Sequence, residues 1–341
     1  MRSRACKTQA VRWRVAAQGC GAQLLRGRYR LGAWVGYRGH RSCCDQGGVN
    51  PLRAFARAVF DSAHVLRSRH QTARKTRILL AYWRLTLKLV TVAPFLRLRR
   101  ERFLGFRLES FDYETLHFLF REIFVRSEYW FDASSDQPLI FDCGANIGMA
   151  TLFFKWLYPR SVIHCFEPDR PTFEMLRRNV QANQLTDVHP HNVALSDAVG
   201  AVEFFVSASR EGSLLMSLDP QRSTGADNKS TIVDGTKLSA FVNGTPVDLV
   251  KLDIEGAEGL VIRDLVESGV IRKIKQFVVE YHHHVDHGKA GLGDFLCLFQ
   301  EAGFDYQIGS VWASPQGRNE FQDIMVQAFR SDFLAERSRA Y

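Results

Sequence analysis

The fold of this chain is decided by one stretch of sequence, FDCGANIG at residues 141–148. The apolar residues 139–143 have the length of a buried strand, and residues 149–158 have the length of a helix. Between them lie Gly144 and Gly148, and glycine lets the backbone turn sharply and approach a ligand without a Cβ clash. We therefore expect a strand, a ligand-binding turn and a helix here.

The spacing of this turn, D-x-G-x-N-x-G, differs from the G-x-G-x-x-G of dinucleotide-binding turns. An acid two residues before the first glycine would repel a pyrophosphate, whereas it suits a cofactor that carries ammonium and sulfonium groups. S-adenosylmethionine has that charge pattern. We predict that Asp142, Gly144, Asn146 and Gly148 bind this cofactor at the carboxyl end of the strand.

Strands and helices alternate after the turn. Further strands are expected at 162–166, 188–193, 247–254 and 276–281, and helices at 170–183, 257–268 and 292–302. Residues 201–206 and 230–233 predict a hairpin, and residues 304–308 and 321–329 an antiparallel pair. Strands that alternate with helices of this length are typical of a parallel sheet covered on both faces. We predict a mostly parallel, doubly wound α/β sheet of seven strands that closes with an antiparallel hairpin.

A second motif, FEPD at residues 166–169, ends the strand after the turn. Its acid Glu167 can accept hydrogen bonds from both hydroxyls of a ribose. Charge compensation at a helix N-terminus explains Asp169, beside Pro171, better than it explains Glu167. We predict that Glu167 binds the cofactor's ribose. NAD would also satisfy such an acid, so the glycine spacing discriminates between the two cofactors.

A third motif, NVALSD at residues 192–197, closes the next strand. We predict that the backbone at Ala194 flanks the adenine ring. An ordinary exit from a strand into a turn is the alternative explanation of this motif.

Polar residues also end the last two central strands. Asp253 and Glu255 are two residues apart and share one side of their strand, as Glu280 and His282 do on theirs. Methyl transfer to an alcohol requires an aligned acceptor and removal of its proton. We predict that Asp253 contacts the amino acid part of the cofactor or the acceptor, and that His282 or Glu280 is the base.

The run HHHVDH at residues 282–287 raises the alternative of a metal site with Asp253 and Glu255, because carboxylates suit hard cations. Consecutive histidines on a strand face opposite ways, so they cannot all bind one ion. We therefore predict no metal cofactor. The polar loop at residues 207–229 is expected to act as a lid over the acceptor.

Together these motifs resemble the FkbM family of methyltransferases over residues 113–310. The matching segments, in family order, are DCGANIG (142–148), FEPD (166–169), NVALSD (192–197), VDLVKLDIEGAE (247–258) and VEYH (279–282). The resemblance implies a Rossmann-like class I methyltransferase fold, S-adenosylmethionine as cofactor, and O-methylation of a small-molecule or glycan hydroxyl. Cys143 stands where a hydrophobic residue is commoner. The resemblance does not reach residues 1–100 and does not name the acceptor.

Charge divides the chain. Residues 1–100 carry 22 Lys and Arg against two acidic residues, a formal charge of +20, whereas the remainder carries −11. We interpret residues 1–50 as a disordered basic leader, similar to an organelle transit peptide or added by a mis-assigned start codon. Residues 51–100 are expected to form a basic helical extension, and residues 101–341 the catalytic domain. Seven cysteines in irregular spacing predict a reducing, cytoplasmic compartment.

Residues 78–96 have the length of a membrane span, but basic residues interrupt them. Helical spacing places three of the basic residues of this region on one face: Arg77, Arg84 and Lys88. That stripe is expected to lie opposite Leu80 and Leu87. We predict an amphipathic helix that packs on its own domain, with peripheral contact of residues 78–100 with an anionic membrane as the alternative.

Three other functions fit part of the sequence. An RNA methyltransferase would use the basic leader, but the acidic catalytic body would repel phosphates. A non-catalytic, membrane-associated protein is disfavoured by the acids at the strand ends, and a dehydrogenase by the glycine spacing. We expect a small-molecule or glycan acceptor and no nucleic-acid partner. The oligomeric state does not follow from the sequence.

Overall fold

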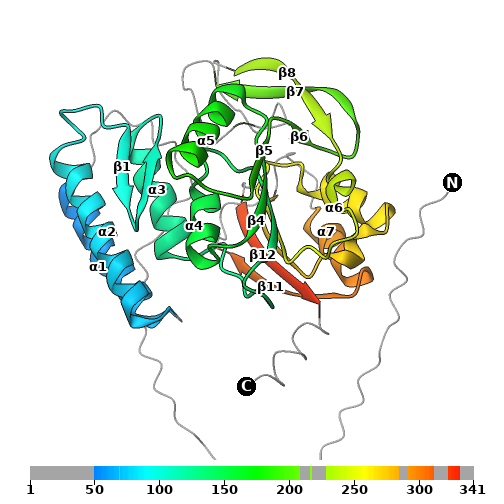
Figure 1. Cartoon of the computed structure of the whole chain (residues 1–341), viewed down its shortest axis with the longest axis horizontal. Coiled ribbons are helices and arrows are strands. Elements are labelled where there is room, and N and C mark those ends of the chain that lie inside the picture. The colour runs from blue at the N-terminus through cyan, green and yellow to red at the C-terminus, as the bar shows by residue number, and fades with distance from the viewer. Residues whose placement is uncertain are drawn as a thin grey trace, which may run out of the picture. The chain divides into compact units, whose positions relative to one another are not determined.

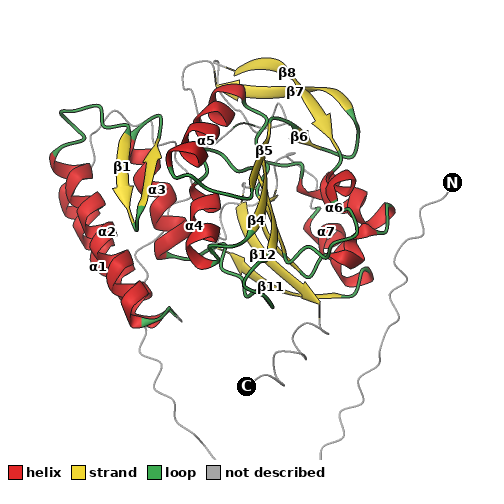
Figure 2. Ribbon diagram, in the orientation of Figure 1, coloured by secondary structure: helices red, strands yellow, loops and turns green. Residues whose placement is uncertain are grey.

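The computed structural model describes residues 50–68, 70–207, 216, 228–283, 291–310 and 322–330. Within them, seven strands form the main sheet in the order β11-β12-β10-β9-β3-β4-β5 (Figures 1 and 2). These strands are β3 (Leu139–Cys143), β4 (Val162–Phe166), β5 (Val188–His191), β9 (Leu249–Leu252), β10 (Gln276–His283), β11 (Phe304–Ser310) and β12 (Gln322–Arg330). The neighbouring strands β5, β4, β3, β9 and β10 are parallel to one another. β12 is antiparallel to both of its neighbours, β10 and β11.

The predicted mostly parallel sheet with a closing antiparallel pair is confirmed. The bounds of several strands differ from the prediction, and β9, predicted at 247–254, spans only Leu249–Leu252. β5 ends at His191, where Asn192 leaves the strand, and β10 continues to His283. This extension exists because β12 pairs with β10 as far as His283 and Gln322. Pairing between distant segments cannot be read from local periodicity.

Helices cover both faces of the sheet, because alternate residues of each strand point to opposite sides. Four helices flank it: α4 (Met149–Leu157), α5 (Arg170–Ala182), α6 (Glu258–Glu267) and α7 (Leu292–Glu301). Ile140 of β3 belongs to the core that contains α4 and α5. The next residue, Phe141, belongs to the core that contains α6 and α7. The alternation of side chains along β3 thus places consecutive residues in two different hydrophobic cores, one on each face of the sheet.

A smaller sheet of β6 (Ala194–Leu195), β8 (Asn228–Thr236) and β7 (Gly200–Ser207) lies beside the main sheet (Figure 1). β7 and β8 pair antiparallel, so the predicted hairpin is confirmed. Single-turn 3-10 helices follow at Leu238–Phe241 and Val270–Lys273. Most of the loop that we predicted as a lid, residues 207–229, lies outside the described residues, as do residues 1–49 of the leader.

The region before β3 forms a helical layer against α4. It consists of α1 (Pro51–Arg67), α2 (Thr72–Thr91), β1 (Arg100–Phe103), β2 (Phe106–Glu109), α3 (Tyr113–Phe120) and a π-helical turn, η1 (Arg121–Val125). Residues of α1, α2 and α3 share one hydrophobic core with α4. A buried ion pair between Asp61 of α1 and Arg121, 2.6 Å apart, fixes the outer helix to η1.

The prediction that the basic stripe of α2 lies opposite Leu80 and Leu87 is wrong. Leu80 and Leu87 do not face away from the basic stripe but lie beside it, with 69% and 51% of their surface exposed. A helix turns by about 100° per residue, so Leu80 and Arg84 are only about 40° apart around the axis. The buried face instead contains Tyr82 and Leu85. None of the described helices is long and apolar enough to cross a membrane.

Candidate functional site

The predicted glycine turn connects β3 to α4 at the carboxyl end of the strand. Gly144 has a φ of 78°, and its N–H donates to the carbonyl of Phe166 at the end of β4. A Cβ at Gly144 would lie 1.8 Å from the carbonyl oxygen of Asp253, so a side chain is excluded there. Gly148, which precedes α4, has a φ of 94°, a left-handed conformation that favours glycine. Glycine at position 144 lets the ends of β3 and β9 approach one another closely.

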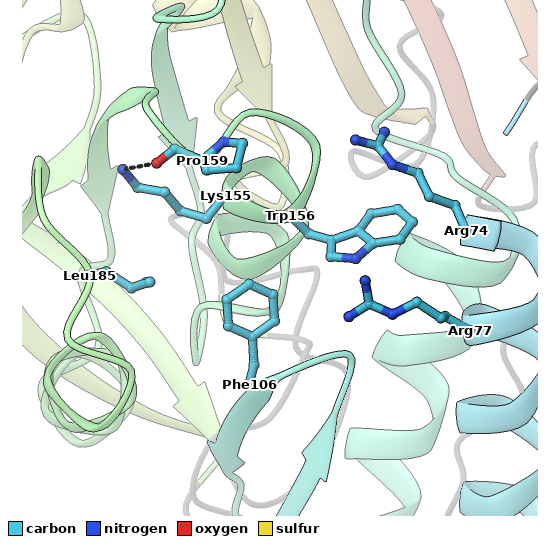
Figure 3. Close-up of a pocket in the computed structure, with 7 residues that line it drawn as sticks. All are labelled: Arg74, Arg77, Phe106, Lys155, Trp156, Pro159 and Leu185. Carbon is cyan, nitrogen blue, oxygen red and sulfur yellow. Dashed lines mark hydrogen bonds between the residues drawn. The ribbon is translucent and has the colours of Figure 1, made fainter. Parts of the chain in front are cut away.

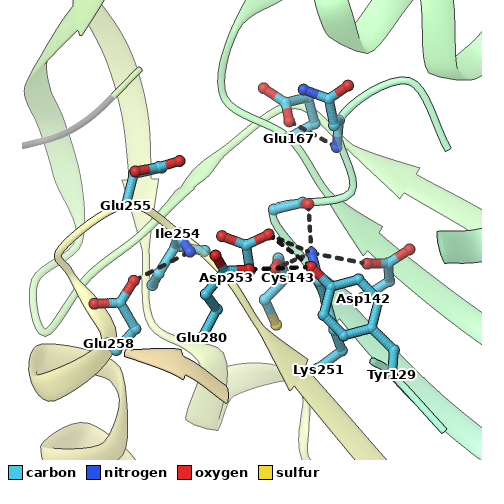
Figure 4. A network of polar contacts seen from close by, with 12 residues as sticks. Tyr129, Asp142, Cys143, Glu167, Lys251, Asp253, Ile254, Glu255, Glu258 and Glu280 are labelled. Atoms are coloured by element: carbon cyan, nitrogen blue, oxygen red, sulfur yellow. Dashed lines mark hydrogen bonds and ion pairs between the residues drawn. The ribbon is translucent and has the colours of Figure 1, made fainter. Parts of the chain in front are cut away.

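Asp142 and Lys251 form a buried ion pair beside this turn (Figure 4). The Asp142 carboxylate accepts a hydrogen bond from Thr151 at 2.7 Å and lies 3.6 Å from Lys251 Nζ. The same Nζ donates to the carbonyl of Gly144 at 2.7 Å. Burial opposes the lysine charge, but Asp253 and Asp142 raise the pKa of Lys251 above its ordinary value. Asp142 therefore supports the turn, and its direct contact with the cofactor stays a prediction.

Glu167 joins the second motif to the glycine turn (Figure 4). Its carboxylate accepts hydrogen bonds from the backbone N–H groups of Asn146 (3.0 Å) and Asp169 (2.9 Å). Burial raises the pKa of Glu167 to about 8, although these two hydrogen bonds favour its charged form. From the next strand end, the Asn192 side chain donates to the carbonyl oxygens of Glu167 and Pro168. The motifs at the ends of β3, β4 and β5 are therefore connected.

The other residues of these motifs have structural roles. Asp169 caps α5 by accepting the N–H of Thr172, as its position before the helix predicted. Ala194 is buried in β6, where it pairs with Gly235 of β8. The contact between Ala194 and the adenine ring stays a prediction.

Asp253 and Glu280 converge on the hydroxyl of Tyr129 (Figure 4). The Tyr129 oxygen lies 3.0 Å from Asp253 Oδ2 and 3.4 Å from Glu280 Oε2. Lys251 Nζ lies 3.5 Å from the same oxygen of Asp253. Tyr129 and Lys251 are buried, whereas 23% of the Asp253 side chain is exposed. The two acids predicted from neighbouring strands are thus held together, with Asp253 accessible to a ligand.

His282 lies among carboxylates on the other side of Asp253. Its Nδ1 lies 2.8 Å from Glu258 Oε1, and its Nε2 lies 3.3 Å from Glu255 Oε2. The same oxygen of Glu258 accepts the backbone N–H of Gly256 at 3.0 Å. Glu258, the first residue of α6, therefore orients both the histidine and the turn that carries Glu255.

Electrostatics distinguishes the two residues predicted as the base. Burial would lower the pKa of His282, but attraction to Glu255 and Glu258 outweighs it and raises that pKa well above its ordinary value. The acids around His282 therefore favour its protonated form, which is the poorer proton acceptor. Burial and the nearby Asp253 raise the pKa of Glu280 well above its ordinary value. A carboxylate with a raised pKa is the stronger base, so the arrangement favours Glu280.

Two overlapping sets of side chains bring their ligand atoms within 4.8 Å of one another: Asp253, Glu255 and His282, and Glu280, His282 and Asp323. His282 belongs to both sets, and its histidine neighbours at residues 284 and 287 lie outside the described residues. The prediction of no metal stays a prediction.

Tyr129 was not found from the sequence. Tyr129 is buried, and it belongs to the aromatic segment that connects η1 to β3 in the sequence. No regular residue spacing links this segment to the residues at the strand ends. The contact of Tyr129 with Asp253 spans 124 residues of sequence. The only available signal was a tyrosine beside Trp130 and Phe131, and such a cluster reads as core packing.

A separate pocket of 380 Å³ lies at the other end of α4 (Figure 3). It is lined by Arg74, Arg77, Phe106, Lys155, Trp156, Pro159 and Leu185. Lys155 donates to the backbone carbonyl of Ser161, and the Arg74 guanidinium lies 5.0 Å from the centre of the Trp156 ring. No lining residue is acidic, so the pocket does not suit a cationic cofactor.

Known proteins resemble this chain in sequence and fold. The family model of the methyltransferase FkbM domain matches residues 142–306. Methyltransferase 1 of Beauveria bassiana is 32% identical over 167 residues, which cover 44% of this chain and 67% of the relative. The 31-O-demethyl-FK506 methyltransferase FkbM of Streptomyces tacrolimicus is 28% identical over 216 residues, 55% of this chain and 81% of the relative. The solved structure of TYW2 from M. jannaschii with AdoMet has a TM-score of 0.34 and 14% identity, over 67% of this chain and 84% of that chain.

The fold and the site define a Rossmann-like methyltransferase. The chain belongs to the FkbM methyltransferase family, and its cofactor is S-adenosylmethionine. The residues at the strand ends fit this cofactor. Asp253 is partly exposed and has a lowered pKa, and the glycine turn presents backbone without side chains.

Proposed function

We propose that this protein is an O-methyltransferase that methylates a hydroxyl group of a small molecule or glycan, with Glu280 as the general base. The observation that carries the proposal is the pairing of Asp253 and Glu280 on the Tyr129 hydroxyl. This pairing places a charged carboxylate and a carboxyl of raised pKa beside each other at the strand ends. Two acids in different environments can take different roles in one reaction.

The cofactor supplies an electrophilic methyl group on a sulfonium sulfur when it is bound. Glu167 is proposed to bind the ribose hydroxyls, and the backbone of the glycine turn to lie against the amino acid part. Asp253 binds the ammonium group of the cofactor or orients the acceptor. Lys251 keeps Asp253 charged, because its attraction lowers the pKa of Asp253 against the opposing effect of burial.

Glu280 accepts the proton of the attacking hydroxyl. As the oxygen–carbon bond forms and the carbon–sulfur bond breaks, that proton passes to the Glu280 carboxylate. His282 acts by position, since its ring nitrogens lie 3.3 Å from Glu255 and 2.8 Å from Glu258. The name of the Streptomyces relative, a 31-O-demethyl-FK506 methyltransferase, supports an oxygen acceptor.

The test uses the full-length protein with S-adenosylmethionine labelled in its methyl group. A small-molecule extract and total RNA, both prepared from one culture of the cells from which the protein comes, serve as separate acceptor fractions. We expect label in the small-molecule fraction that survives mild alkali, because a methyl ether is stable where a methyl ester releases methanol. The Glu280→Gln variant should bind the cofactor and transfer little label.

Other distributions of label contradict the proposal. Label in the RNA fraction would assign the protein to the RNA methyltransferases, and alkali-labile label would indicate a carboxyl acceptor. Full transfer by Glu280→Gln would exclude this residue as the base.

A further inference from the structure

The helices α1 and α2 carry apolar side chains on the surface rather than in the core. On α1, Leu52, Val59 and Leu66 are each more than half exposed. They are seven residues apart, so they form one stripe along the helix. On α2, Leu80 and Leu87 are also more than half exposed and seven residues apart. Each helix therefore has a second apolar face in addition to the one that it buries.

The two stripes border a common seam. Trp83 of α2 donates its indole N–H to Ser62 of α1 at 3.0 Å, and its ring stacks on Phe55 at 6.1 Å. Phe55 lies three residues after Leu52 and four before Val59, and Trp83 has the same relation to Leu80 and Leu87. Residues three and four apart are neighbours on a helix surface. Both stripes thus flank the Phe55–Trp83 contact and form one surface, which we name the hairpin face.

The hairpin face is bordered by positive charge. Residues 51–100 contain 12 Lys and Arg but a single acidic residue, Asp61. Asp61 is buried in its ion pair with Arg121, so it does not offset the charge at the surface. On α2 the exposed Arg77 and Arg84 lie three and four residues from Leu80, so they border its apolar stripe. Among the described residues of this layer, exposed charge beside the stripe is therefore cationic.

The chain also remains apolar and basic after α2. Phe95 and Leu96, in the turn that follows the helix, are 83% and 58% exposed. They are followed by exposed arginines at positions 97, 99 and 100. Contiguous apolar surface with a polar rim marks an interaction site, and leucine, phenylalanine and tryptophan beside arginine suit the headgroup region of an anionic bilayer. Figure 1 shows α1 and α2 at one edge of the molecule.

We propose that the hairpin face docks this enzyme on an anionic membrane surface. The apolar stripes enter the boundary between headgroups and acyl chains, and the arginines contact lipid phosphates and carboxylates. The helices lie in the plane of the membrane, in accord with the lack of a membrane-spanning helix among the described residues. This proposal is independent of the acceptor proposed above.

The test is co-sedimentation of the full-length protein with vesicles. We expect binding to phosphatidylcholine vesicles that contain phosphatidylserine, weak binding to phosphatidylcholine alone, and release at high salt. The double variant Val59→Gln and Leu80→Gln should lower the bound fraction by about fivefold or more. The matched control, Val199→Gln and Ile232→Gln, changes side chains that are 74% and 68% exposed elsewhere, and should bind like the wild type.

A charge variant and a lipid-free measurement complete the design. Arg97→Gln and Arg99→Gln together, beside the exposed Phe95 and Leu96, should weaken the preference for phosphatidylserine. Failure of the wild type to sediment, or equal binding by the Val59 and Leu80 variant, would overturn the proposal. So would a wild-type dimer in sedimentation velocity that the same variant converts to monomers, because a second copy would then cover the hairpin face.

Discussion

At the scale of single residues, the chemistry of the site depends on which carboxyl groups are charged. Lys251 and Tyr129 hold Asp253 in its charged form, with the pKa below its ordinary value despite burial. Glu280, a few ångströms away on the same tyrosine, has a raised pKa because it is buried beside that charge. The division of roles between the two acids is therefore a property of their surroundings, and each surrounding group can be removed in turn.

Glu280→Gln should lower kcat by about 100-fold to 10,000-fold, because the amide cannot accept a proton. The dissociation constant for S-adenosylmethionine, measured by calorimetry, should stay close to that of the wild type. In the wild type, kcat should fall as pH decreases through a pKa above the ordinary carboxyl value of 4.5. Glu203→Gln, an exposed acid on β7, is the control and should change neither quantity.

Gly144→Ala should abolish cofactor binding, because its Cβ would lie 1.8 Å from the Asp253 carbonyl oxygen. Gly303→Ala is a matched control: its φ is 82°, close to the 78° of Gly144, but no atom lies within 4 Å of the added Cβ. The control should cost about 1 kcal/mol of stability and leave binding intact. Equal calorimetric binding by both variants would show that the close approach at Gly144 is dispensable.

Chelation should leave activity unchanged, because the ammonium of Lys251, 3.5 Å from Asp253, already balances part of the carboxylate charge. The measurement is kcat after dialysis against EDTA, with and without added Mg²⁺ or Zn²⁺. A loss that one of these ions restores would instead place a cation among Asp253, Glu255 and His282.

At the scale of elements, one buried ion pair joins the outer helices of the helical layer to η1. Asp61 of α1 contacts Arg121 of η1 and accepts a hydrogen bond from Tyr82 of α2 at 2.7 Å. One carboxylate thus connects three helical segments. This is why α1, which is distant in sequence from the sheet, belongs to the same core as α4.

Asp61→Asn should destabilise the protein by about 2 to 3 kcal/mol, because it removes one of the two carboxylates, Asp61 and Glu122, that pair with the buried Arg121. The free energy of unfolding in urea is the measurement. Asp136→Asn is the control, since its ion pair with Arg160 is 73% and 62% exposed and should contribute less than about 1 kcal/mol. Similar losses in the two variants would mean that burial does not govern the strength of these pairs.

At the scale of the whole molecule, the charge asymmetry of the sequence matches a division in the structure. The basic residues between positions 51 and 100 lie on a helical layer, and the acids gather at the strand ends of the sheet. Burial of neutral histidines in the helical layer also couples folding to pH. Burial and the charge of Arg121 lower the pKa of His117 to about 4, from 6.5.

The wild type should lose stability as pH falls from about 6.5 towards 4, because the unfolded chain binds a proton at His117 that the folded chain excludes. Between pH 7 and 5 this residue should account for about 2 kcal/mol of the loss. His117→Gln should show a correspondingly flatter dependence of unfolding free energy on pH, although it is less stable at pH 7. An unchanged slope would exclude His117 as a source of acid sensitivity.

The sequence by itself determined the alternation of strands and helices, the glycine turn and the acids at the strand ends. These features have local causes: residue periodicity, backbone freedom at Gly144 and Gly148, and the rule that parallel strands end at one edge. Asp253, Glu280 and His282 could be placed near one another for that reason, before any coordinates were known.

Only the tertiary structure decided the surroundings of those residues, on which their charge states depend. Tyr129 reaches Asp253 across 124 residues, and the pKa of His282 depends on Glu255 and Glu258 from another element. Likewise, only the tertiary structure showed which face of α2 is buried and that the stripe of Leu80 and Leu87 on the other face is exposed. Charge states and exposure depend on distances between segments that are remote in sequence, and no local pattern encodes those distances.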